Sequence, residues 1–280
     1  MKSKVGIFGY PISHSISPVF QQAAFTDLGI SVAYESWLVS SDELEDKINA
    51  LRHNDYFGVN VTIPHKVQSI NHVDEVDPWA QKVGSINTIV NRRGKLFGFN
   101  TDGYGFLKSL QVEANYHPKE KKVLVIGAGG AARAAVHTLV EEGADVVIAN
   151  RTIEKAFDIA NEFENEHLVQ VVNMSGKYFQ RALDSASLIV NCTPMGMRGG
   201  QFQNDSPLDS SQIRENVLVY DMVYNPIITP LLKQAKIAGA ETISGLSMLV
   251  FQGAESFKLW TGKTPSISVM LKAASEALRY

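Results

Sequence analysis

The chain has 280 residues, of which 45% are hydrophobic and 20% charged, and its formal net charge is −3 at pH 7. This composition is typical of a globular protein of about two domains and excludes disordered, collagenous and disulfide-rich classes. The near-neutral charge, without a long basic run, argues against a nucleic-acid partner or an anionic membrane surface.

Cysteine and histidine usage bears on metal sites and compartment. Cys192 is the single cysteine, and the seven histidines lack the spacing of metal ligands. We therefore expect no metal site and a reducing compartment. The first apolar run is broken by Gly6, Gly9 and Pro11 before the core of a signal peptide could form, and no apolar stretch approaches the ~18 residues of a membrane helix. The expected location is the cytoplasm.

Short apolar runs alternate with helix-length amphipathic segments near the N-terminus. Strands are expected at residues 4–8, 32–38 and 58–61, and helices at residues 18–28 and 42–52. This alternation predicts βαβ units and a parallel sheet. Ser17 is a good N-cap for a helix with Pro18 in its first turn.

A second alternating block follows residues 113–122, which contain Pro118 and mixed charges and form the best linker candidate. A short helix is expected before this linker, at residues 104–110. In the second block, strands are expected at residues 123–126, 146–149, 187–190 and 217–220, and helices at residues 131–142, 153–163 and 230–237. The glycine-rich residues 195–209 predict a long loop.

A glycine-rich turn joins the strand at residues 123–126 to the helix that follows. Gly127-Ala128-Gly129-Gly130-Ala131-Ala132 matches the GxGxxG/A pattern of dinucleotide-binding proteins in its required strand-turn-helix context. Gly127 permits the tight turn, and Gly129 lets backbone N–H groups approach a pyrophosphate at the helix N-terminus. A turn needed only for packing is the alternative, and the context favours dinucleotide binding.

The next strand ends in Asn150-Arg151-Thr152, and Lys155 follows. NAD-binding folds carry an acid here for the ribose 2′-OH, but this chain has none. Arg151 and Lys155 instead match a 2′-phosphate. A solvated basic helix start is the alternative, although cations are mildly unfavourable at a helix N-terminus. The segment predicts NADP rather than NAD.

Four polar clusters lie at strand or helix ends outside this nucleotide module. They are Ser13-His14-Ser15-Ile16-Ser17-Pro18, Asn60-Val61-Thr62-Ile63-Pro64-His65-Lys66, Asn87-Thr88 and Asn100-Thr101-Asp102-Gly103. Each alone is explained by capping, turn formation or solvation. Together they predict a ligand site, because ligands bind outside the carboxyl ends of the strands in open α/β sheets.

Eight motifs follow one another along the chain. They are Gly9-Tyr-Pro-Ile-Ser-His-Ser15-Ile-Ser17-Pro, Asn60-Val-Thr-Ile-Pro-His-Lys66, Gly84-Ser-Ile-Asn87-Thr, Asn100-Thr-Asp102-Gly, Gly127-Ala-Gly-Gly-Ala131, Asn150-Arg-Thr152, Asp221-Met-Val-Tyr224-Asn-Pro and Gly245-Leu-Ser-Met-Leu-Val-Phe-Gln252. In this order they resemble the shikimate dehydrogenase family over essentially the whole chain. The resemblance implies reversible, NADP-dependent reduction of 3-dehydroshikimate to shikimate, a step of chorismate and aromatic amino-acid biosynthesis.

The resemblance also implies the domain organisation of an α/β protein. Residues 1–102 would form an N-terminal α/β substrate-binding domain, completed by C-terminal helices at residues 245–280. Residues 103–244 would form a Rossmann-type, doubly wound NADP-binding domain. The helix expected at residues 245–260 would carry Gly245 to the cofactor and Gln252 to the substrate. A monomer or a homodimer is expected.

Individual roles follow from the same resemblance. Ser15 and Ser17 would bind the substrate carboxylate, with Tyr224 nearby. The residues expected to hold the ring hydroxyls are Thr62, Lys66, Asn87, Asp102 and Gln252. The residues expected to bind the cofactor are Gly127, Ala128, Gly129, Gly130, Ala131, Asn150, Arg151, Thr152, Lys155, Thr193, Met222 and Gly245.

Lys66 and Asp102 are the implied catalytic pair. Reduction of the C3 carbonyl builds negative charge on its oxygen, which a positioned ammonium can stabilise and protonate. Asp102 would orient Lys66 and the hydroxyl, and because a coupled pair titrates as a unit the formal acid stays open. His14 and His65 are expected to be structural.

Two departures and two alternatives accompany the resemblance. Gln21-Gln22 stands where many members have His-Asn, and Ser85 replaces an alanine; neither removes a ligand. A quinate/shikimate dehydrogenase using NAD is one alternative, which Arg151, Lys155 and Ser17 disfavour. A nucleotide-binding regulator that has lost catalysis is the other, which Lys66 and Asp102 disfavour.

Overall fold

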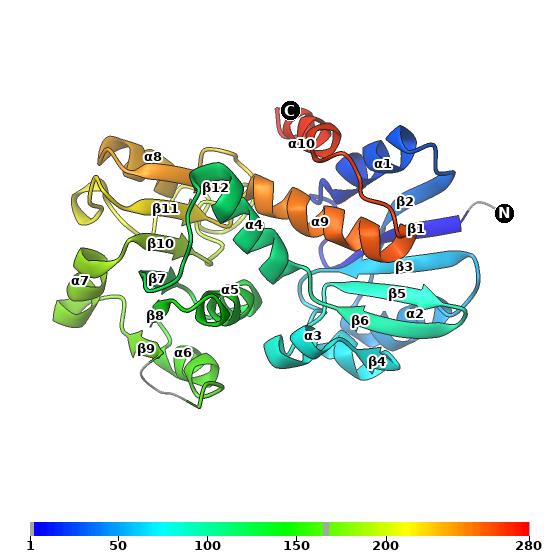
Figure 1. The fold of residues 1–280 in the computed structure, drawn as a ribbon, viewed down its shortest axis with the longest axis horizontal. Coiled ribbons are helices and arrows are strands. Elements are labelled where there is room, and N and C mark those ends of the chain that lie inside the picture. Colours follow the sequence, from blue (N-terminus) through cyan, green and yellow to red (C-terminus); the bar gives the residue numbers. More distant parts are fainter. Residues whose placement is uncertain (1–2, 165–167, 280) are drawn as a thin grey trace. The chain divides into compact units, whose positions relative to one another are not determined.

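The computed structural model describes residues 3–164 and 168–279, and these form two compact units. The first unit consists of Met1–Gly105 and Val250–Tyr280, and the second of Phe106–Leu249. Helices α4 (Asp102–Ala114) and α9 (Gly245–Thr261) each pass from one unit into the other (Figure 1). None of the described helices is long and apolar enough to span a membrane.

The first unit contains a six-stranded sheet in the order β2-β1-β3-β5-β6-β4. Its strands are β1 (Ser3–Gly9), β2 (Val32–Leu38), β3 (Tyr56–Val61), β4 (Glu75–Val76), β5 (Thr88–Arg92) and β6 (Lys95–Phe99). Strands β2, β1 and β3 are parallel neighbours, as the alternating pattern predicts.

The prediction of a parallel sheet is wrong at β5, although β4 and β6 are again parallel neighbours. Strand β5 pairs antiparallel with both β3 and β6. A two-residue turn, Arg93-Gly94, joins β5 to β6, and both residues have positive φ, 56° and 88°. Paired positive φ values suit the right-handed twist of a hairpin. A hairpin therefore replaces the helical crossover that a parallel pair would need.

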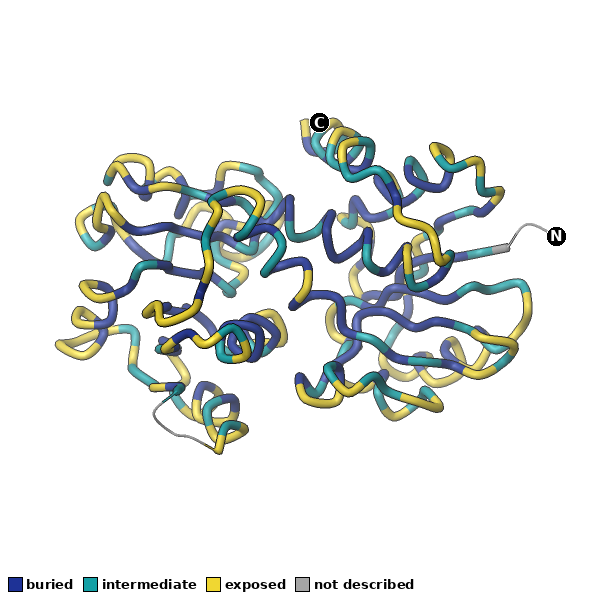
Figure 2. Tube along the Cα trace, viewed as in Figure 1, coloured by how far each residue is buried: buried dark blue, intermediate teal, exposed yellow. Residues whose placement is uncertain are grey.

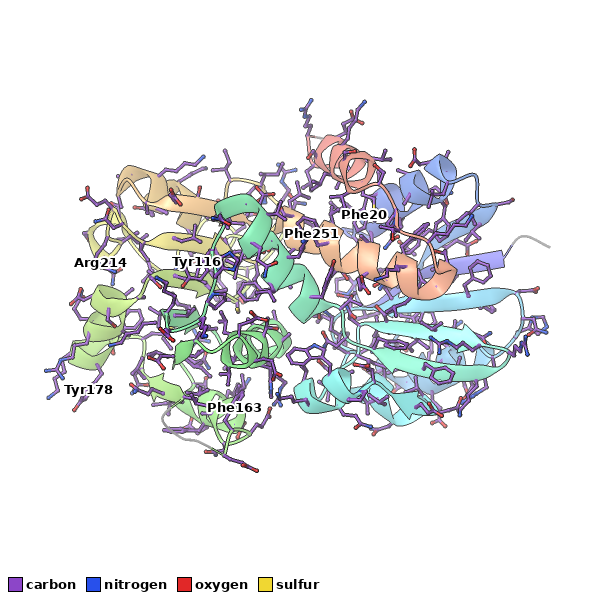
Figure 3. The ribbon with its side chains drawn as sticks, in the orientation of Figure 1. Phe20, Tyr116, Phe163, Tyr178, Arg214 and Phe251 are labelled. Atoms are coloured by element: carbon purple, nitrogen blue, oxygen red, sulfur yellow. The ribbon has the colours of Figure 1, made fainter. Side chains whose placement is uncertain are left out.

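The remaining elements of the first unit are helical. They are α1 (Ser17–Asp27), η1 (Ser41–Glu43), α2 (Leu44–Ala50), η2 (Gln68–His72), α3 (Pro78–Val83), α10 (Ile267–Ala277) and most of α9. The predicted N-cap Ser17 is instead the first helical residue, because Ile16 occupies the cap without a side-chain bond. Pro18 lies in the first turn, as predicted. Phe20 of α1 packs where α9 has a glycine, since a Cβ on Gly253 would lie 2.6 Å from its ring (Figure 3).

The second unit contains a six-stranded sheet that is parallel throughout. Its strands are β7 (Lys122–Ile126), β8 (Asp145–Ala149), β9 (Val169–Val172), β10 (Leu188–Asn191), β11 (Leu218–Asp221) and β12 (Glu241–Ser244). Their order is β12-β11-β10-β7-β8-β9. This is the doubly wound Rossmann order, in which the strand sequence reverses between β7 and β10.

Helices cover both faces of this second sheet. They are α5 (Gly130–Glu141), α6 (Ile153–Ala160), α7 (Gly176–Ser185) and α8 (Pro230–Ile237), and η3 (Ser210–Gln212) is a short turn. Along β7, Val123 and Val125 belong to one core cluster while Leu124 and Ile126 belong to the other. A strand buried on both faces explains the continuous apolar run in the sequence, and Figure 2 shows the central strands of this sheet, such as β10 and β11, as largely buried.

The linker prediction for residues 113–122 needs correction. Helix α4 continues to Ala114, and β7 begins at Lys122. The intervening residues connect two elements of the second unit, whereas the boundary between the units falls within α4, between Gly105 and Phe106. Proline and mixed charge therefore marked an ordinary surface loop.

Candidate functional site

Lys66 and Asp102 form an ion pair in the first unit. Lys66 follows β3, and Asp102 is the first residue of α4. Lys66 Nζ donates to Asp102 Oδ2 at 2.6 Å, and the two side chains are 25% and 10% exposed. The helix N-terminus favours the negative charge of Asp102. The ammonium is thus oriented by a nearly buried carboxylate and still has accessible surface for a substrate.

Asn87 joins this pair to α9. Its Nδ2 lies 2.9 Å from Asp102 Oδ1, 2.9 Å from Thr101 Oγ1 and 3.1 Å from Gln252 Oε1. An amide has two N–H hydrogens and can fully serve only two of these three acceptors at once. An incoming ligand hydroxyl can therefore exchange into the cluster. Lys66, Asn87, Asp102 and Gln252, predicted from four separate motifs, lie in one hydrogen-bonded group.

Asn87 adjoins a buried network of polar side chains. Ser256 lies one turn after Gln252 on α9, and its Oγ is 2.7 Å from Thr88 Oγ1 and 3.2 Å from Thr101 Oγ1. Asn60 Nδ2 donates to Ser256 Oγ at 3.0 Å and to the Asn87 carbonyl at 3.1 Å. No role was predicted for Asn60, Thr88, Thr101 or Ser256. Asn60, Thr88 and Thr101 belong to the family motifs that begin at Asn60, Gly84 and Asn100, whereas no motif includes Ser256.

The other predicted substrate residues are spread over both units. Ser15 is half-buried and Ser17 is buried, and the Ser17 N–H donates to Ser15 Oγ at 3.3 Å. Thr62 is half-buried just after β3. Tyr224 belongs to the second unit, after β11, and burial raises the pKa of its hydroxyl.

The two histidines expected to be structural differ in exposure. His65 is fully buried, with Nε2 2.7 Å from the Val39 carbonyl, whereas His14 is exposed. At the two departures from the family pattern, Gln21 donates from Nε2 to the Gly253 carbonyl at 2.8 Å, and Ser85 Oγ accepts from Asn100 at 3.1 Å. Both departures therefore make contacts within the first unit.

In the second unit, the glycine-rich turn lies where the strand order reverses. Gly127 has φ +110°, and a Cβ there would lie 3.1 Å from Thr193 Cγ2. Gly129 is the N-cap of α5 and Gly130 its first residue, and a Cβ at either would meet no atom within 4 Å. Exposed backbone N–H groups at a helix N-terminus fit the pyrophosphate of a dinucleotide.

A basic segment follows the neighbouring strand β8. Asn150 Nδ2 donates to the Thr152 carbonyl at 2.7 Å, and Thr152 is the N-cap of α6. Arg151 and Lys155 are exposed, and neither has an ion-pair partner among the described residues. Two unpaired cations beside the dinucleotide turn fit a 2′-phosphate.

Three of the residues predicted to bind the cofactor, Thr193, Met222 and Gly245, lie close together. Thr193 follows β10 and Met222 follows β11, and Met222 Sδ is 3.5 Å from the thiol of Cys192. Gly245 begins α9, and a Cβ there would lie 2.2 Å from the Met222 carbonyl oxygen. A side chain at Gly245 would therefore displace the loop that carries Met222.

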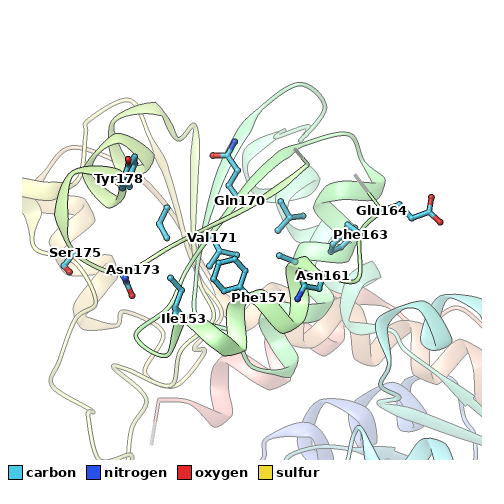
Figure 4. A pocket seen from close by; sticks show the side chains of 13 residues that line it. Ile153, Phe157, Asn161, Phe163, Glu164, Gln170, Val171, Asn173, Ser175 and Tyr178 are labelled. Atoms are coloured by element: carbon cyan, nitrogen blue, oxygen red, sulfur yellow. The ribbon is translucent and has the colours of Figure 1, made fainter. Parts of the chain in front are cut away.

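Among the described residues, neither a metal cluster nor the surface pocket beside β9 marks these sites. Within the described part of the chain, no three His, Cys, Asp or Glu side chains could together hold a metal ion. A cavity of ≈ 770 Å³ lies beside the edge strand β9, lined by α6 residues such as Phe157 and by Val171, Asn173 and Tyr178 (Figure 4). None of the predicted site residues lines this cavity.

Three family models and many known proteins match this chain. Residues 7–89 match the shikimate dehydrogenase substrate binding domain, residues 110–196 match the shikimate/quinate 5-dehydrogenase family, and residues 245–274 match the shikimate 5′-dehydrogenase C-terminal domain. The NADP(+) shikimate dehydrogenase of Methanopyrus kandleri is 42% identical over 279 residues, covering 98% of this chain and 96% of the relative. The chain belongs to the shikimate dehydrogenase family. These matches confirm the resemblance inferred from its motifs.

Solved structures of shikimate dehydrogenases also match along nearly the whole chain. The Thermus thermophilus enzyme in complex with NADP(H) and shikimate has a TM-score of 0.89 and 37% identity, covering 99% of this chain and 100% of that one. Quinate dehydrogenase from Corynebacterium glutamicum in complex with NAD has the same TM-score, 29% identity, and coverage of 98% and 99%. The predicted two-domain α/β class with a Rossmann-type sheet is confirmed.

Proposed function

We propose that this chain is an NADP-dependent oxidoreductase that reversibly reduces 3-dehydroshikimate to shikimate. This reaction is a step of chorismate and aromatic amino-acid biosynthesis. Membership of the shikimate dehydrogenase family supports it, as do NADP-dependent relatives of 42% and 41% identity. The observation that carries the proposal is the hydrogen-bonded group of Lys66, Asn87, Asp102 and Gln252.

Lys66 and Asp102 are the catalytic residues in this proposal. When bound, NADPH supplies the hydride that reduces the C3 carbonyl carbon. The Lys66 ammonium stabilises the negative charge that develops on the carbonyl oxygen, and a proton from the Lys66–Asp102 pair converts that oxygen to the hydroxyl. In the reverse direction the pair accepts this proton. The 2.6 Å contact supports shared proton transfer.

The remaining roles concern recognition of a small hydroxylated acid. Ser15 and Ser17 bind the carboxylate, and Tyr224 also contributes to substrate binding. Thr62, Asn87 and Gln252 join the catalytic pair in binding the ring hydroxyls. A site built from hydroxyl-binding groups rejects analogues that lack a hydroxyl, because its buried polar atoms are then left unpaired. Asn87 and Gln252 are the buried polar side chains that supply such hydroxyl-binding groups here.

The residues of the second unit fit NADP. Residues 127–131 bind the pyrophosphate, Asn150, Arg151, Thr152 and Lys155 bind the adenosine 2′-phosphate, and Thr193, Met222 and Gly245 lie at the nicotinamide. The open backbone at Gly129 and Gly130 and the exposed cations Arg151 and Lys155 support this assignment. An NAD-binding fold would instead carry an acid at the end of β8.

The domain assignment is part of the proposal. Residues 1–102 with 245–280 form the substrate-binding domain, and residues 103–244 form the NADP-binding domain. The two compact units support it, although their boundaries fall a few residues later in the chain. A cytoplasmic location and a monomeric or homodimeric state stay predictions.

Crossing two substrates with two cofactors tests the activity. Formation of reduced nicotinamide is followed by absorbance with shikimate or quinate, each with NADP+ or NAD+. We expect turnover with shikimate and NADP+ to exceed the other three combinations. Preference for quinate with NAD+ would establish the alternative quinate/shikimate dehydrogenase. Turnover with none of the four combinations would overturn the enzyme assignment.

A further inference from the structure

Asn191 and Asp221 are polar residues in the fully buried interior of the second unit. They end the parallel neighbours β10 and β11 and are directly paired in register. Asn191 Nδ2 donates to Asp221 Oδ1 at 2.9 Å. The two side chains therefore join the carboxyl ends of two strands beside the point where the strand order reverses.

Asn191 holds the loop that carries Thr193. Its Oδ1 accepts from the Thr193 N–H at 3.0 Å and from Thr193 Oγ1 at 2.7 Å. The Asn191 carbonyl also accepts from the Met222 N–H at 3.0 Å. One asparagine thus fixes backbone atoms of both loops that follow β10 and β11.

Asp221 holds the second loop through both of its carboxylate oxygens. Oδ1 accepts from the Val223 N–H at 3.1 Å, and Oδ2 accepts from Thr229 Oγ1 at 2.5 Å. Thr229 in turn caps α8 by accepting from the Leu232 N–H. The Val223 carbonyl accepts from the Gly245 N–H at 3.3 Å, which extends the chain of contacts to the start of α9.

Asp221 has no cationic partner among the described residues, and burial raises the pKa of its carboxyl to about 6. A buried carboxylate without a countercharge costs free energy, so packing alone does not explain this residue. The side-chain contacts of the pair are directed at the loops that carry Thr193 and Met222, and the Val223 carbonyl links the second of these loops to Gly245.

We infer that Asn191 and Asp221 are positioning residues that set the nicotinamide ring of the cofactor for hydride transfer. They act through Thr193, Met222 and Gly245 and do not themselves touch the reacting atoms. The inference rests on the proposed function, because it assumes that NADP binds the second unit. It assigns a role to two buried residues that the substrate and cofactor contacts leave unexplained.

The location of the pair predicts an effect on one end of the cofactor. Its side-chain contacts reach only the loops after β10 and β11. The pyrophosphate turn follows β7, and Arg151 and Lys155 follow β8. Loss of the pair should disturb the nicotinamide end and leave binding of the phosphoadenosine end intact.

Two ligands separate these ends. Calorimetric titration gives the affinity for NADP+ and for 2′-phospho-ADP-ribose, which has the same phosphates but no nicotinamide. We expect Asn191→Ala to weaken NADP+ binding relative to binding of the fragment by roughly 5-fold or more, because the N–H and hydroxyl of Thr193 lose their acceptor and Asp221 loses a donor. We expect kcat with shikimate to fall about 10- to 100-fold, since a misplacement of about 1 Å has an effect of that order.

Ser109→Ala is the matched control. Ser109 is buried in the same unit, and its hydroxyl contacts Tyr220 Oη at 2.7 Å and the Phe106 carbonyl at 2.7 Å, which lie in β11 and α4 and not in the loops after β10 and β11. This variant should lose stability but keep the wild-type ratio of the two affinities. Asp221→Asn is a second test variant, which keeps the shape of the side chain and removes its charge.

The outcomes are distinct. A selective loss of NADP+ affinity and kcat in Asn191→Ala or Asp221→Asn supports the positioning role. Parallel weakening of both ligands, or no change in either, overturns it. If wild-type protein binds neither ligand, the NADP assignment itself fails, so the two failures are distinguishable.

Discussion

Lys66 Nζ lies 2.6 Å from Asp102 Oδ2, although the two residues are 36 positions apart in the sequence. Asp102 also accepts a hydrogen bond from Asn87 through its other oxygen. The carboxylate therefore contacts both the cation proposed to act in catalysis and the amide proposed to bind the substrate.

Removing the amine should affect chemistry more than binding. We expect Lys66→Ala to lower kcat about 10²- to 10⁴-fold, as for loss of a general acid or base, with a smaller change in KM for shikimate. Steady-state kinetics measure both. Lys95→Ala, which removes another lysine ion-paired in the first unit, is the control and should be near wild type. A near-normal kcat for Lys66→Ala would refute the catalytic assignment.

Ser256 should affect both stability and the KM for shikimate, because its network adjoins Asn87 and Gln252. In Ser256→Ala the hydroxyls of Thr88 and Thr101 and the amide of Asn60 lose a buried partner. We expect the free energy of unfolding to fall by about 1–3 kcal/mol and KM for shikimate to rise. Urea unfolding and kinetics measure the two effects. Thr261→Val removes a similar bond to the preceding turn of α9, outside the network, and should leave KM unchanged.

The basic segment after β8 should determine cofactor choice. A charge-assisted hydrogen bond contributes about 1.5–3 kcal/mol. Arg151→Ala should therefore lower the affinity for NADP+ by roughly 10-fold or more, while the affinity for NAD+ changes little. Binding of both cofactors at low and high salt measures this preference. Lys177→Ala, an exposed lysine in the first turn of α7, serves as the control. Equal losses of affinity for NADP+ and NAD+ in Arg151→Ala would contradict a contact between Arg151 and the 2′-phosphate.

The stability of the protein should depend on pH through Asp221. Burial raises the pKa of its carboxyl from 3.8 to about 6, while hydrogen bonds from Thr229, Val223 and Asn191 oppose this shift. The folded state then binds more protons than the unfolded state between these values, so the contribution of Asp221 to stability falls as pH rises from about 4 to about 6.

Urea unfolding across this pH range measures the effect. The Asp221→Asn variant cannot titrate at this position, so its stability should fall less steeply with pH than that of the wild type. The neighbouring acids Cys192 and Tyr220 do not complicate this range, because burial raises the pKa of each. Identical slopes in the two proteins would show that Asp221 keeps the same pKa when the protein unfolds.

Much of the second unit could be predicted from its sequence, because its signals are local. Apolar runs such as residues 123–126 predict buried strands, and the glycine turn between β7 and α5 needs particular backbone conformations that the residue types reveal. In the first unit, the strands β5 and β6 and their antiparallel pairing escaped prediction. A two-residue turn beginning with Arg93 lacks the usual residue types of such a hairpin.

The sequence by itself determined the cofactor module, the family and the residues of the proposed catalytic pair, because each depends on short motifs in a fixed order. Only the tertiary structure decided which polar residues meet. Ser256 and Thr88 are 168 positions apart, and Asn191 and Asp221 are 30 apart. Such contacts are set by helix packing and by the register of parallel strands, which no local pattern of residues records.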